Sequence, residues 1–503
     1  MAAALTPVAL GFGLGASQAM AQDAGVGKPA VTITPRVSVT QTYTDNSLLS
    51  STNARSEWIT QVSPGLRVVS QSGRIRGTFE YSLNEFAYAN HTRGRQRQNA
   101  LNSNGVAELV DGSTFLDFSG QISQQSISAL AAPTTTQGAN SANSTETSTF
   151  RLSPYVRGVM AGAVDYEARY GWTWTNADSA NASDVRSREW QVRLASAGSG
   201  ALGWSADAAA KTMNYSLGRT LRENHVQGAL NYAFTPQVKG SLLLSQYSDN
   251  YATVSMDSQF STGLGLNWAV SPATKIAAQM ERRSFGQSHS ISFEHRTART
   301  AWRFSDSRTA TAAPAESGTT VVGSLSDLLF AQFAGVEPDP LKRATLVDQF
   351  MQTYGLRSDT KVISNFLSSS ATLQRRQEAS FAILGVRDSV TFVLSRSSSS
   401  KLDTVVVAFD DFSNNSVIQQ TGFTTSWAHR LTPDWAVNLS ATSQRSSGST
   451  AGAGTLLRSV DLTFTGRFGR QMSGSFGARR VWFDSTTAPY SESAVIGSLN
   501  VQF

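Results

Sequence analysis

The chain has 503 residues, of which 40% are hydrophobic and only 16% charged, whereas about a quarter of the residues in soluble domains are charged. Its 25 Phe, 12 Tyr and 10 Trp argue against disorder, and the lack of cysteine excludes disulfides, thiolate metal sites and cysteine nucleophiles. The formal net charge of +6 comes from scattered basic residues, so we expect no nucleic-acid partner.

The N-terminal segment is typical of a secretory signal peptide. Residues 2–16 are small and apolar, and Ala19-Met20-Ala21 has the small-x-small form of a signal-peptidase site. No Lys or Arg precedes Lys28, which leaves open a start upstream of Met1. We predict a cleaved signal peptide over 1–21, a short segment over 22–30 and a β-barrel over 31–503. No later run approaches the roughly 18 to 20 apolar residues of a membrane-spanning helix.

Alternating polarity from residue 31 onward predicts β-strands. Over 164–175 one parity is apolar and the other carries Asp165, Glu167 and Arg169, a separation that only a strand produces. The same pattern recurs over 74–83, 226–234 and 259–270. Many runs reach the length of a tilted membrane-crossing strand, whereas average strands have about five or six residues. A soluble β-propeller is the alternative.

Tight turns alternate with long polar loops. The turn-forming pairs are Asp111-Gly112, Ala161-Gly162, Thr235-Pro236, Ser271-Pro272, Gly385 to Asp388 and Thr432-Pro433. This asymmetry is typical of bacterial outer-membrane barrels. We therefore predict an all-β fold, a transmembrane antiparallel outer-membrane β-barrel of about 22 strands in the cell outer membrane of a Gram-negative bacterium.

Aromatic residues toward strand ends predict an interfacial girdle. Its candidate members are Tyr43, Trp172, Trp174, Tyr247, Trp268 and Trp482. Two of them belong to a short repeat, Tyr43-Thr44-Asp45-Asn46 and Tyr247-Ser248-Asp249-Asn250. We interpret its Asp-Asn pairs as turn formers rather than ligand-binding residues.

One segment departs from the strand pattern. Between residues 324 and 356 apolar residues recur every three or four positions, and Asp339-Pro340 forms a credible helix start. We predict a small helical insertion at about 318–358. Its two helices could plug the lumen, cap the mouth or fold only on each other.

The last strand carries a candidate assembly signal. Apolar residues alternate up to a terminal aromatic, as in the C-terminal signal that the barrel assembly machinery reads. The signal residues are Val495, Leu499, Val501 and Phe503.

Charged residues opposite the apolar parity are candidates for the lumen lining. They are Arg76, Glu80, Asp165, Glu167, Arg169, Lys211, Lys239, Lys275, Glu281 and Arg283. Mixed signs predict a wet, polar interior, and a barrel this wide cannot be filled by side chains alone. The simpler interpretation is that these charges only pair and solvate the wall.

Several motifs together resemble a known family. They are Tyr43-x-Asp45-Asn46, the segment from Glu294 to Trp302, Asp339 to Arg343, Leu373 to Arg376 and Gly385 to Asp388. Over nearly the whole mature chain the sequence resembles the PEP-CTERM system-associated outer-membrane proteins. The resemblance implies an outer-membrane β-barrel linked to exopolysaccharide and protein-sorting loci, without a demonstrated activity.

The leading functional hypothesis is a porin-like channel or accessory barrel for export of exopolysaccharide or another polar cargo. A structural or surface-interaction barrel is the alternative, and an outer-membrane hydrolase ranks last because the five histidines are dispersed and no nucleophile motif is present. A siderophore transporter should carry a plug before its first strand, whereas strand patterning here begins near Val31. We expect no enzyme activity, cofactor or metal. Expected partners are outer-membrane lipid, lipopolysaccharide, the barrel assembly machinery, exopolysaccharide and its periplasmic export components.

Overall fold

The computed structural model describes residues 31–503 except 72, 134–137, 139–141, 199, 313–329, 331–342, 344–345, 348–365, 404–410 and 451. The predicted signal peptide and the segment 22–30 lie outside the described residues. So does most of the predicted helical insertion, of which the structure describes Phe330, Arg343, Leu346 and Val347, all with helical backbone. Within the described part of the chain, no helix is long and apolar enough to cross a membrane.

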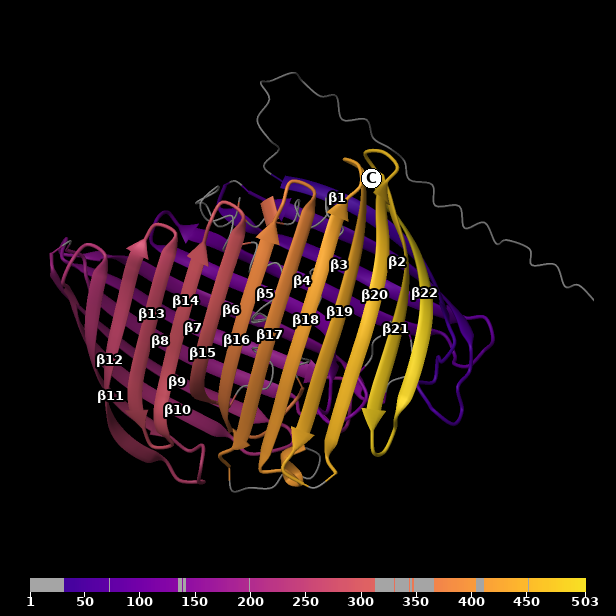
Figure 1. The fold of residues 1–503 in the computed structure, drawn as a ribbon. Coiled ribbons are helices and arrows are strands. Elements are labelled where there is room, and N and C mark those ends of the chain that lie inside the picture. Colours follow the sequence, from indigo (N-terminus) through magenta and orange to yellow (C-terminus); the bar gives the residue numbers. More distant parts are fainter. Residues whose placement is uncertain are drawn as a thin grey trace, which may run out of the picture.

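Apart from the four helical residues named above, the regular structure of the described residues consists of twenty-two strands and one short 3-10 helix, η3 (Asp411–Ser413) (Figure 1). The strands are β1 (Val31–Thr44), β2 (Glu57–Ser70), β3 (Ile75–Tyr88), β4 (Gln96–Val110), β5 (Thr114–Ser126), β6 (Ser144–Met160), β7 (Val164–Ala177), β8 (Val185–Ser196), β9 (Leu202–Tyr215), β10 (Leu221–Ala233), β11 (Val238–Asp249), β12 (Asp257–Ser271), β13 (Thr274–Arg283), β14 (Gly286–Arg296), β15 (Thr300–Thr311), β16 (Thr372–Leu384), β17 (Asp388–Lys401), β18 (Val417–Arg430), β19 (Trp435–Gly448), β20 (Gly454–Arg467), β21 (Met472–Ser485) and β22 (Tyr490–Gln502).

The strands form one closed antiparallel barrel. Each strand pairs with its neighbours in sequence, and β1 pairs with β22 from Arg36↔Gln502 to Thr44↔Ala494. Closure satisfies the backbone groups that an open sheet edge would leave unpaired. The structure confirms the predicted antiparallel barrel and its number of strands.

The two ends of the barrel differ in their connections. Every connection from an even-numbered to an odd-numbered strand is a tight turn, and all six turn pairs recognised in the sequence lie at this short-turn end. Connections from odd-numbered to even-numbered strands form the long-loop end, which carries the segments 45–56, 127–143, 312–371 and 402–416. In Figure 1 the short-turn end is at the top, beside the C-terminus.

Two prolines lie inside strands. Pro64 in β2 pairs with Val37 of β1, and Pro154 in β6 pairs with Leu116 of β5. On the opposite side of each proline the paired register is interrupted, toward β3 and β7 respectively. Proline has no N–H to donate, so each one is accommodated where a ladder bond is missing.

Alternation along the strands separates two faces of the wall. Trp172 and Phe381 share a face with exposed apolar side chains, and this face is directed outward. The opposite face, with Thr173 and Ser380, is polar and directed into the barrel. Buried apolar clusters occur mainly inside the long-loop end, where the loops contact the inner wall.

Candidate functional site

The strand register places the ten candidate lumen residues on the inward face. Glu80 on β3 forms an ion pair with Arg36 on β1, and Lys211 on β9 lies opposite both Glu189 and Glu223. The set comprises Arg76, Glu80, Asp165, Glu167, Arg169, Lys211, Lys239, Lys275, Glu281 and Arg283. The inner wall is therefore lined by charges of both signs.

An ion-pair ladder runs around the inner wall from β5 to β9. The Arg169 guanidinium contacts Asp117 of β5, and its Nε lies 3.2 Å from Glu167 Oε1. Farther along, Arg193 Nε lies 3.6 Å from Asp207 Oδ1. The charges are partly exposed, so each pair contributes little to the stability of the barrel. The main effect of the ladder is to keep the inner wall hydrated.

Inward aromatic rings accompany these charges. The guanidinium of Arg169 stacks 4.0 Å from the ring centre of Tyr155, and that of Arg157 lies 4.4 Å from the ring centre of Phe115. The two rings stack on each other with centroids 5.1 Å apart. Phe115 is 2% and Tyr155 is 9% exposed, so the guanidinium groups cover these rings, and charged groups form the surface that reaches the lumen here.

Tyr247 differs from the expected girdle position, because it lies on the inward face. Its hydroxyl donates to Glu281 Oε2 at 3.0 Å, and the Arg283 guanidinium lies 3.6 Å from its ring centre. The consecutive leucines at 242–244 hide the alternation in β11, so the parity of Tyr247 could not be read from the sequence.

The other candidate girdle residues lie on the outward face. Tyr43 contacts Trp58 with ring centroids 5.0 Å apart, and Trp172 contacts Tyr170 at 4.4 Å. The outward tryptophans that the sequence analysis did not name as girdle candidates are Trp58, Trp190, Trp204, Trp302, Trp427 and Trp435, although each shares the apolar parity of its strand. Taken with the candidates, the tryptophans toward the long-loop end are Trp58, Trp172, Trp174 and Trp482, and those toward the short-turn end are Trp204, Trp268, Trp302, Trp427 and Trp435.

The candidate assembly signal lies on the closing strand. Val495, Leu499 and Val501 of β22 face outward opposite Tyr43, Val39 and Val37 of β1. The Phe503 amide donates to Pro35 O at 2.9 Å, and its side chain is exposed. Within the described residues no group of three or more His, Asp or Glu side chains is arranged to hold a metal ion.

A polar cavity of about 680 Å³ lies against the inner wall toward the short-turn end. Its walls include Arg36 of β1, Gln61 of β2 and Asn84 of β3. The turn after β20, with Gly469 and Arg470, closes one side. The cavity is a space inside the barrel that polar groups surround, and a hydrated solute could occupy it.

At the long-loop end, part of the 312–371 connection crosses the interior. Phe366 forms a parallel bridge with Ser126 at the end of β5, and the Leu367 amide donates to Ser126 O at 3.1 Å. The same connection enters β16 at Thr372, half the circumference away in strand order. The crossing segment 366–371 therefore spans the mouth.

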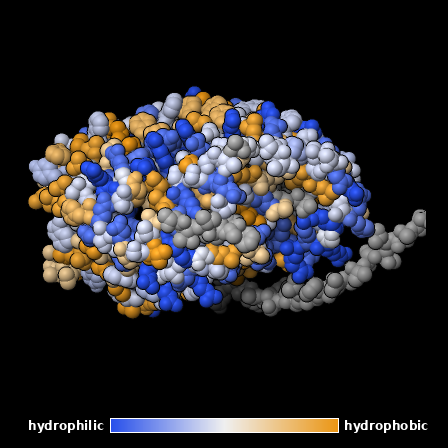
Figure 2. All heavy atoms as spheres, turned by 90° about the horizontal axis from the view of Figure 1, so that it is seen from below, coloured by the Kyte–Doolittle hydropathy of each residue, from blue (hydrophilic) through white to orange (hydrophobic). Residues whose placement is uncertain are grey.

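Three loops meet at a small apolar cluster that we call the mouth junction: Ala129, Phe366, Phe412 and Ile418. The rings of Phe366 and Phe412 have centroids 6.1 Å apart, and the Ala129 amide donates to Asp411 Oδ2 at 2.7 Å. Figure 2 views the molecule from this end, with hydrophilic side chains over much of the face and hydrophobic ones along parts of its edge.

A second contact region holds the loops to the wall. Ala312 and Ala371, at the two ends of the long connection, pack with Met213, Leu221 and Tyr251. The Arg219 guanidinium donates to Asp403 Oδ2 at 2.9 Å in a nearly buried ion pair, and also to Tyr251 O at 2.8 Å.

The Tyr251 phenol belongs to the same region. Its hydroxyl donates to Glu223 Oε2 at 2.6 Å. Burial, followed by the nearby negative charge of Glu223, raises the pKa of Tyr251 well above its usual value. The phenol therefore remains a donor at neutral pH.

The two Asp-Asn repeats brace loops. The Asn46 side chain donates to Ser50 O at 2.8 Å and accepts from the Ser50 amide at 3.1 Å. Asn250 accepts from the Arg222 amide and donates to Thr220 O. These contacts fit the predicted turn chemistry.

No family model matches the chain, and no curated protein matches it. Among solved structures it is similar to the FrpB iron transporter from Neisseria meningitidis, with 10% identity, 93% of this chain and 81% of that chain covered, and a TM-score of 0.52. It is also similar to the siderophore receptor PirA from Acinetobacter baumannii, with 10% identity, coverage of 94% and 80%, and a TM-score of 0.51. At this identity the likeness establishes a shared barrel fold.

Proposed function

We propose that the protein is an outer-membrane channel of a Gram-negative bacterium, with its long-loop end outside the cell. Support comes from the outward apolar face, which carries tryptophans toward both ends as interfacial belts do, and from the charged inner wall. The fold shared with outer-membrane receptors agrees with this location. Secretion by the predicted signal peptide would leave Gln22 as the first residue, which N-terminal sequencing of the mature protein tests.

The observation that carries the channel proposal is the polar lumen. Twenty-two strands enclose more space than side chains can fill, and the inner wall holds charge pairs and a polar cavity of about 680 Å³. Apolar packing is concentrated at the mouth junction and the adjoining loop contacts. The wall thus suits a hydrated cargo, while the crossing segment restricts entry.

For the cargo we propose exopolysaccharide, moving outward. Tyr247 lies half-buried on the lumen face beside Glu281 and Arg283, and the Arg169–Glu167 pair lies on the same face, so that a ring, carboxylates and guanidinium groups are available to sugar faces and hydroxyls. The resemblance to the PEP-CTERM system-associated proteins supports the same assignment. If it is correct, polysaccharide-synthesis and protein-sorting genes should lie beside the gene for this protein.

A non-conducting structural barrel is the second candidate, and one observation favours it. The crossing segment and the mouth junction pack like the core of a soluble protein rather than like a loosely held lid. The two proposals differ in whether ions pass through the intact protein.

Single-channel conductance in a planar bilayer tests the proposal. The proteins to compare are the refolded mature chain, a variant lacking 318–358 and Phe412→Ala, with Phe423→Ala on the outward face as the control. Steady steps in the intact protein, or steps only in the first two variants, support a channel that is open or gated at the mouth. Silence in all of them, with folding verified by resistance to heat in detergent, overturns it in favour of a structural barrel.

Cargo is tested on whichever form conducts. Alginate oligomers added on the short-turn side should produce transient current blocks, and Tyr247→Ala should shorten them. Tyr232→Ala, an outward tyrosine on the neighbouring strand β10, is the matched control. Equal blocks with and without Tyr247 would overturn the proposed sugar contact.

A further inference from the structure

Arginines gather on the outward face of β15–β17, on the long-loop side of the apolar residues. Ile383, Phe381 and Ala379 follow one another on the outward parity of β16, which then continues as Gln377 and Arg375. On β17 the same parity passes from Phe392 and Leu394 to Arg396. A guanidinium on this parity faces away from the lumen, so the ion-pair ladder does not explain it.

Three of these arginines line one small cleft of about 230 Å³. Its walls are formed by Arg308, Leu373, Arg375, Gln377, Arg396, Ser398 and Ser400. Arg308 lies opposite Arg375, and Gln377 opposite Arg396, in consecutive strand pairs. Like charges are thus held side by side on one surface, which costs free energy unless an anion lies between them.

The cleft is pre-organised by a single carboxylate. Asp306 Oδ2 accepts from Arg375 at 2.7 Å and from Gln377 Nε2 at 3.1 Å, and Asp306 Oδ1 lies 3.2 Å from His289 Nε2. Arg308 donates to backbone carbonyls, to Gln287 O at 2.7 Å and Phe285 O at 3.4 Å. Among the described residues, no carboxylate pairs with Arg308 or Arg396. Three guanidinium groups against one carboxylate leave a net positive cleft.

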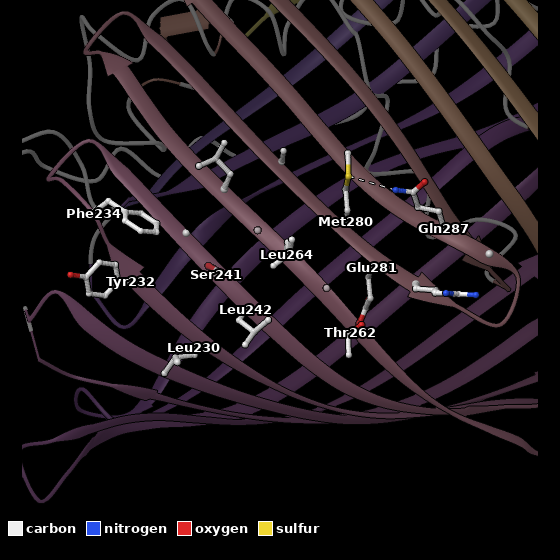
Figure 3. Close-up of a pocket in the computed structure, with 17 residues that line it drawn as sticks. Leu230, Tyr232, Phe234, Ser241, Leu242, Thr262, Leu264, Met280, Glu281 and Gln287 are labelled. Carbon is white, nitrogen blue, oxygen red and sulfur yellow. Dashed lines mark hydrogen bonds between the residues drawn. The ribbon is translucent and has the colours of Figure 1, made fainter.

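An apolar groove begins where Arg308 meets β14. It occupies about 1030 Å³ on the outer wall over β10–β14, and Leu230, Leu242, Leu264 and Met280 line it (Figure 3). Ala278 leaves room on its floor because its outward side chain is small, whereas the Phe234 ring lies over Gly240. Its lining extends to Gly286 and Gln287, and Arg308 holds the Gln287 carbonyl.

We propose that the cleft and the groove together bind a phosphorylated, multiply acylated glycolipid of the outer leaflet, lipopolysaccharide. Arg308, Arg375 and Arg396 would hold the phosphate groups, and the groove over β10–β14 would hold acyl chain. The inference rests on the proposed outer-membrane location, because only there does the long-loop end face this lipid. Charge complementarity and the direct continuation from basic cleft to apolar groove favour this lipid over a soluble anion.

Other outward arginines at the same end provide a matched control. Arg97, Arg458 and Arg480 each pair with a carboxylate, Glu85, Asp484 and Asp45 respectively. Because their charge is already balanced, neutralising them should disturb lipid phosphates far less. The two sets are alike in residue type, face and end of the barrel.

The test measures lipid binding to the full-length mature protein in detergent by native mass spectrometry. The cleft variant carries Arg308→Gln, Arg375→Gln and Arg396→Gln, and the control carries Arg97→Gln, Arg458→Gln and Arg480→Gln. Bisphosphorylated lipid A should bind the cleft variant roughly tenfold or more weakly than wild type, because charge-assisted bonds to phosphate are lost. The control should change by less than about twofold.

Single substitutions distinguish a specific loss of lipid binding from misfolding of the triple variant. Arg396→Gln removes an exposed side chain with no described partner, so it should weaken binding without altering heat resistance of the barrel. Ala278→Phe should weaken binding by filling the groove, while leaving the arginines intact. Equal loss in both arginine sets, equal binding of dephosphorylated lipid A, or equal binding of phosphatidylglycerol would overturn the proposal.

The result is separable from the channel proposal. If the barrel does not conduct in the bilayer but binds lipid A through the cleft, the lipid-site proposal stands and the channel proposal fails. If the barrel conducts but binds lipid A and phosphatidylglycerol equally, the channel proposal stands and the lipid-site proposal fails.

Discussion

The short-turn and long-loop ends are built from the same strands but held together differently. At the short-turn end, backbone bonds close tight turns, and the cavity inside has polar walls. At the long-loop end, side chains from distant loops pack at the mouth junction and around Tyr251. One barrel can therefore combine a membrane-type wall with a mouth that depends on hydrophobic burial, as a soluble core does.

The largest expected effect comes from Phe412→Ala at the mouth junction. Phe412 is 3% exposed, and truncating a buried phenylalanine costs about 3–5 kcal/mol. We expect faster hydrogen exchange in peptides containing Ala129 and Ile418, with the strands away from the mouth junction unchanged. Phe423→Ala, on the outward face and 41% exposed, should leave those peptides protected. Equal deprotection in the two variants would contradict the comparison.

Breaking the Arg219–Asp403 pair should have the next largest effect. Arg219→Ala leaves a buried carboxylate without this partner, which costs about 3 kcal/mol. Hydrogen exchange should rise in the segment 216–221 and at Tyr251. Arg74→Ala, at an exposed ion pair with Asp111 at the short-turn end, should change local protection by less than about 1 kcal/mol. If Arg219→Ala changes hydrogen exchange as little as Arg74→Ala does, the apolar packing of the loops alone holds the mouth together.

A smaller effect concerns pH. The raised pKa of Tyr251 means that the protonated phenol is favoured in the folded mouth. Its contribution is therefore fully present below the unfolded value of about 10 and is lost as pH rises through the folded pKa. The urea concentration at which half of the molecules have unfolded mouth loops should fall less between pH 9 and 11 in Tyr251→Phe than in wild type. An identical decline in both proteins would exclude this phenol as the cause.

The smallest expected effect lies at the short-turn end. Ala161 has a φ of 51°, a left-handed conformation that costs a side chain roughly 1 kcal/mol and favours glycine. Ala161→Gly should therefore raise the free energy of unfolding by up to about 1 kcal/mol in urea titrations. Hydrogen exchange in the peptides that contain Ala129 and Ile418 should be the same as in wild type. A loss of stability would mean that the turn is not strained.

Much of the wall could be predicted from the sequence, because alternation within one strand is local information. The turns, the strand number and the inward charges such as Glu167 follow from it. Tyr247 could not be placed, since three leucines before it obscure the parity. The mouth junction could not be foreseen either, because it joins loops far apart in the chain. Arg375 and Arg396 carry a signal in the sequence, a charge on the apolar parity of a strand, but Arg458 carries the same signal in an exposed ion pair, so the sequence alone does not distinguish them.

The pairing of β1 with β22 has a consequence for assembly kinetics. These strands are the most widely separated in the chain, so forming their contact carries the highest entropic cost of loop closure of any strand pair in the wall. Until that contact forms, both strands present unpaired edges that invite pairing with other chains. The slow step of folding is therefore expected to be ring closure, and a chaperone that shields those edges would act at this stage.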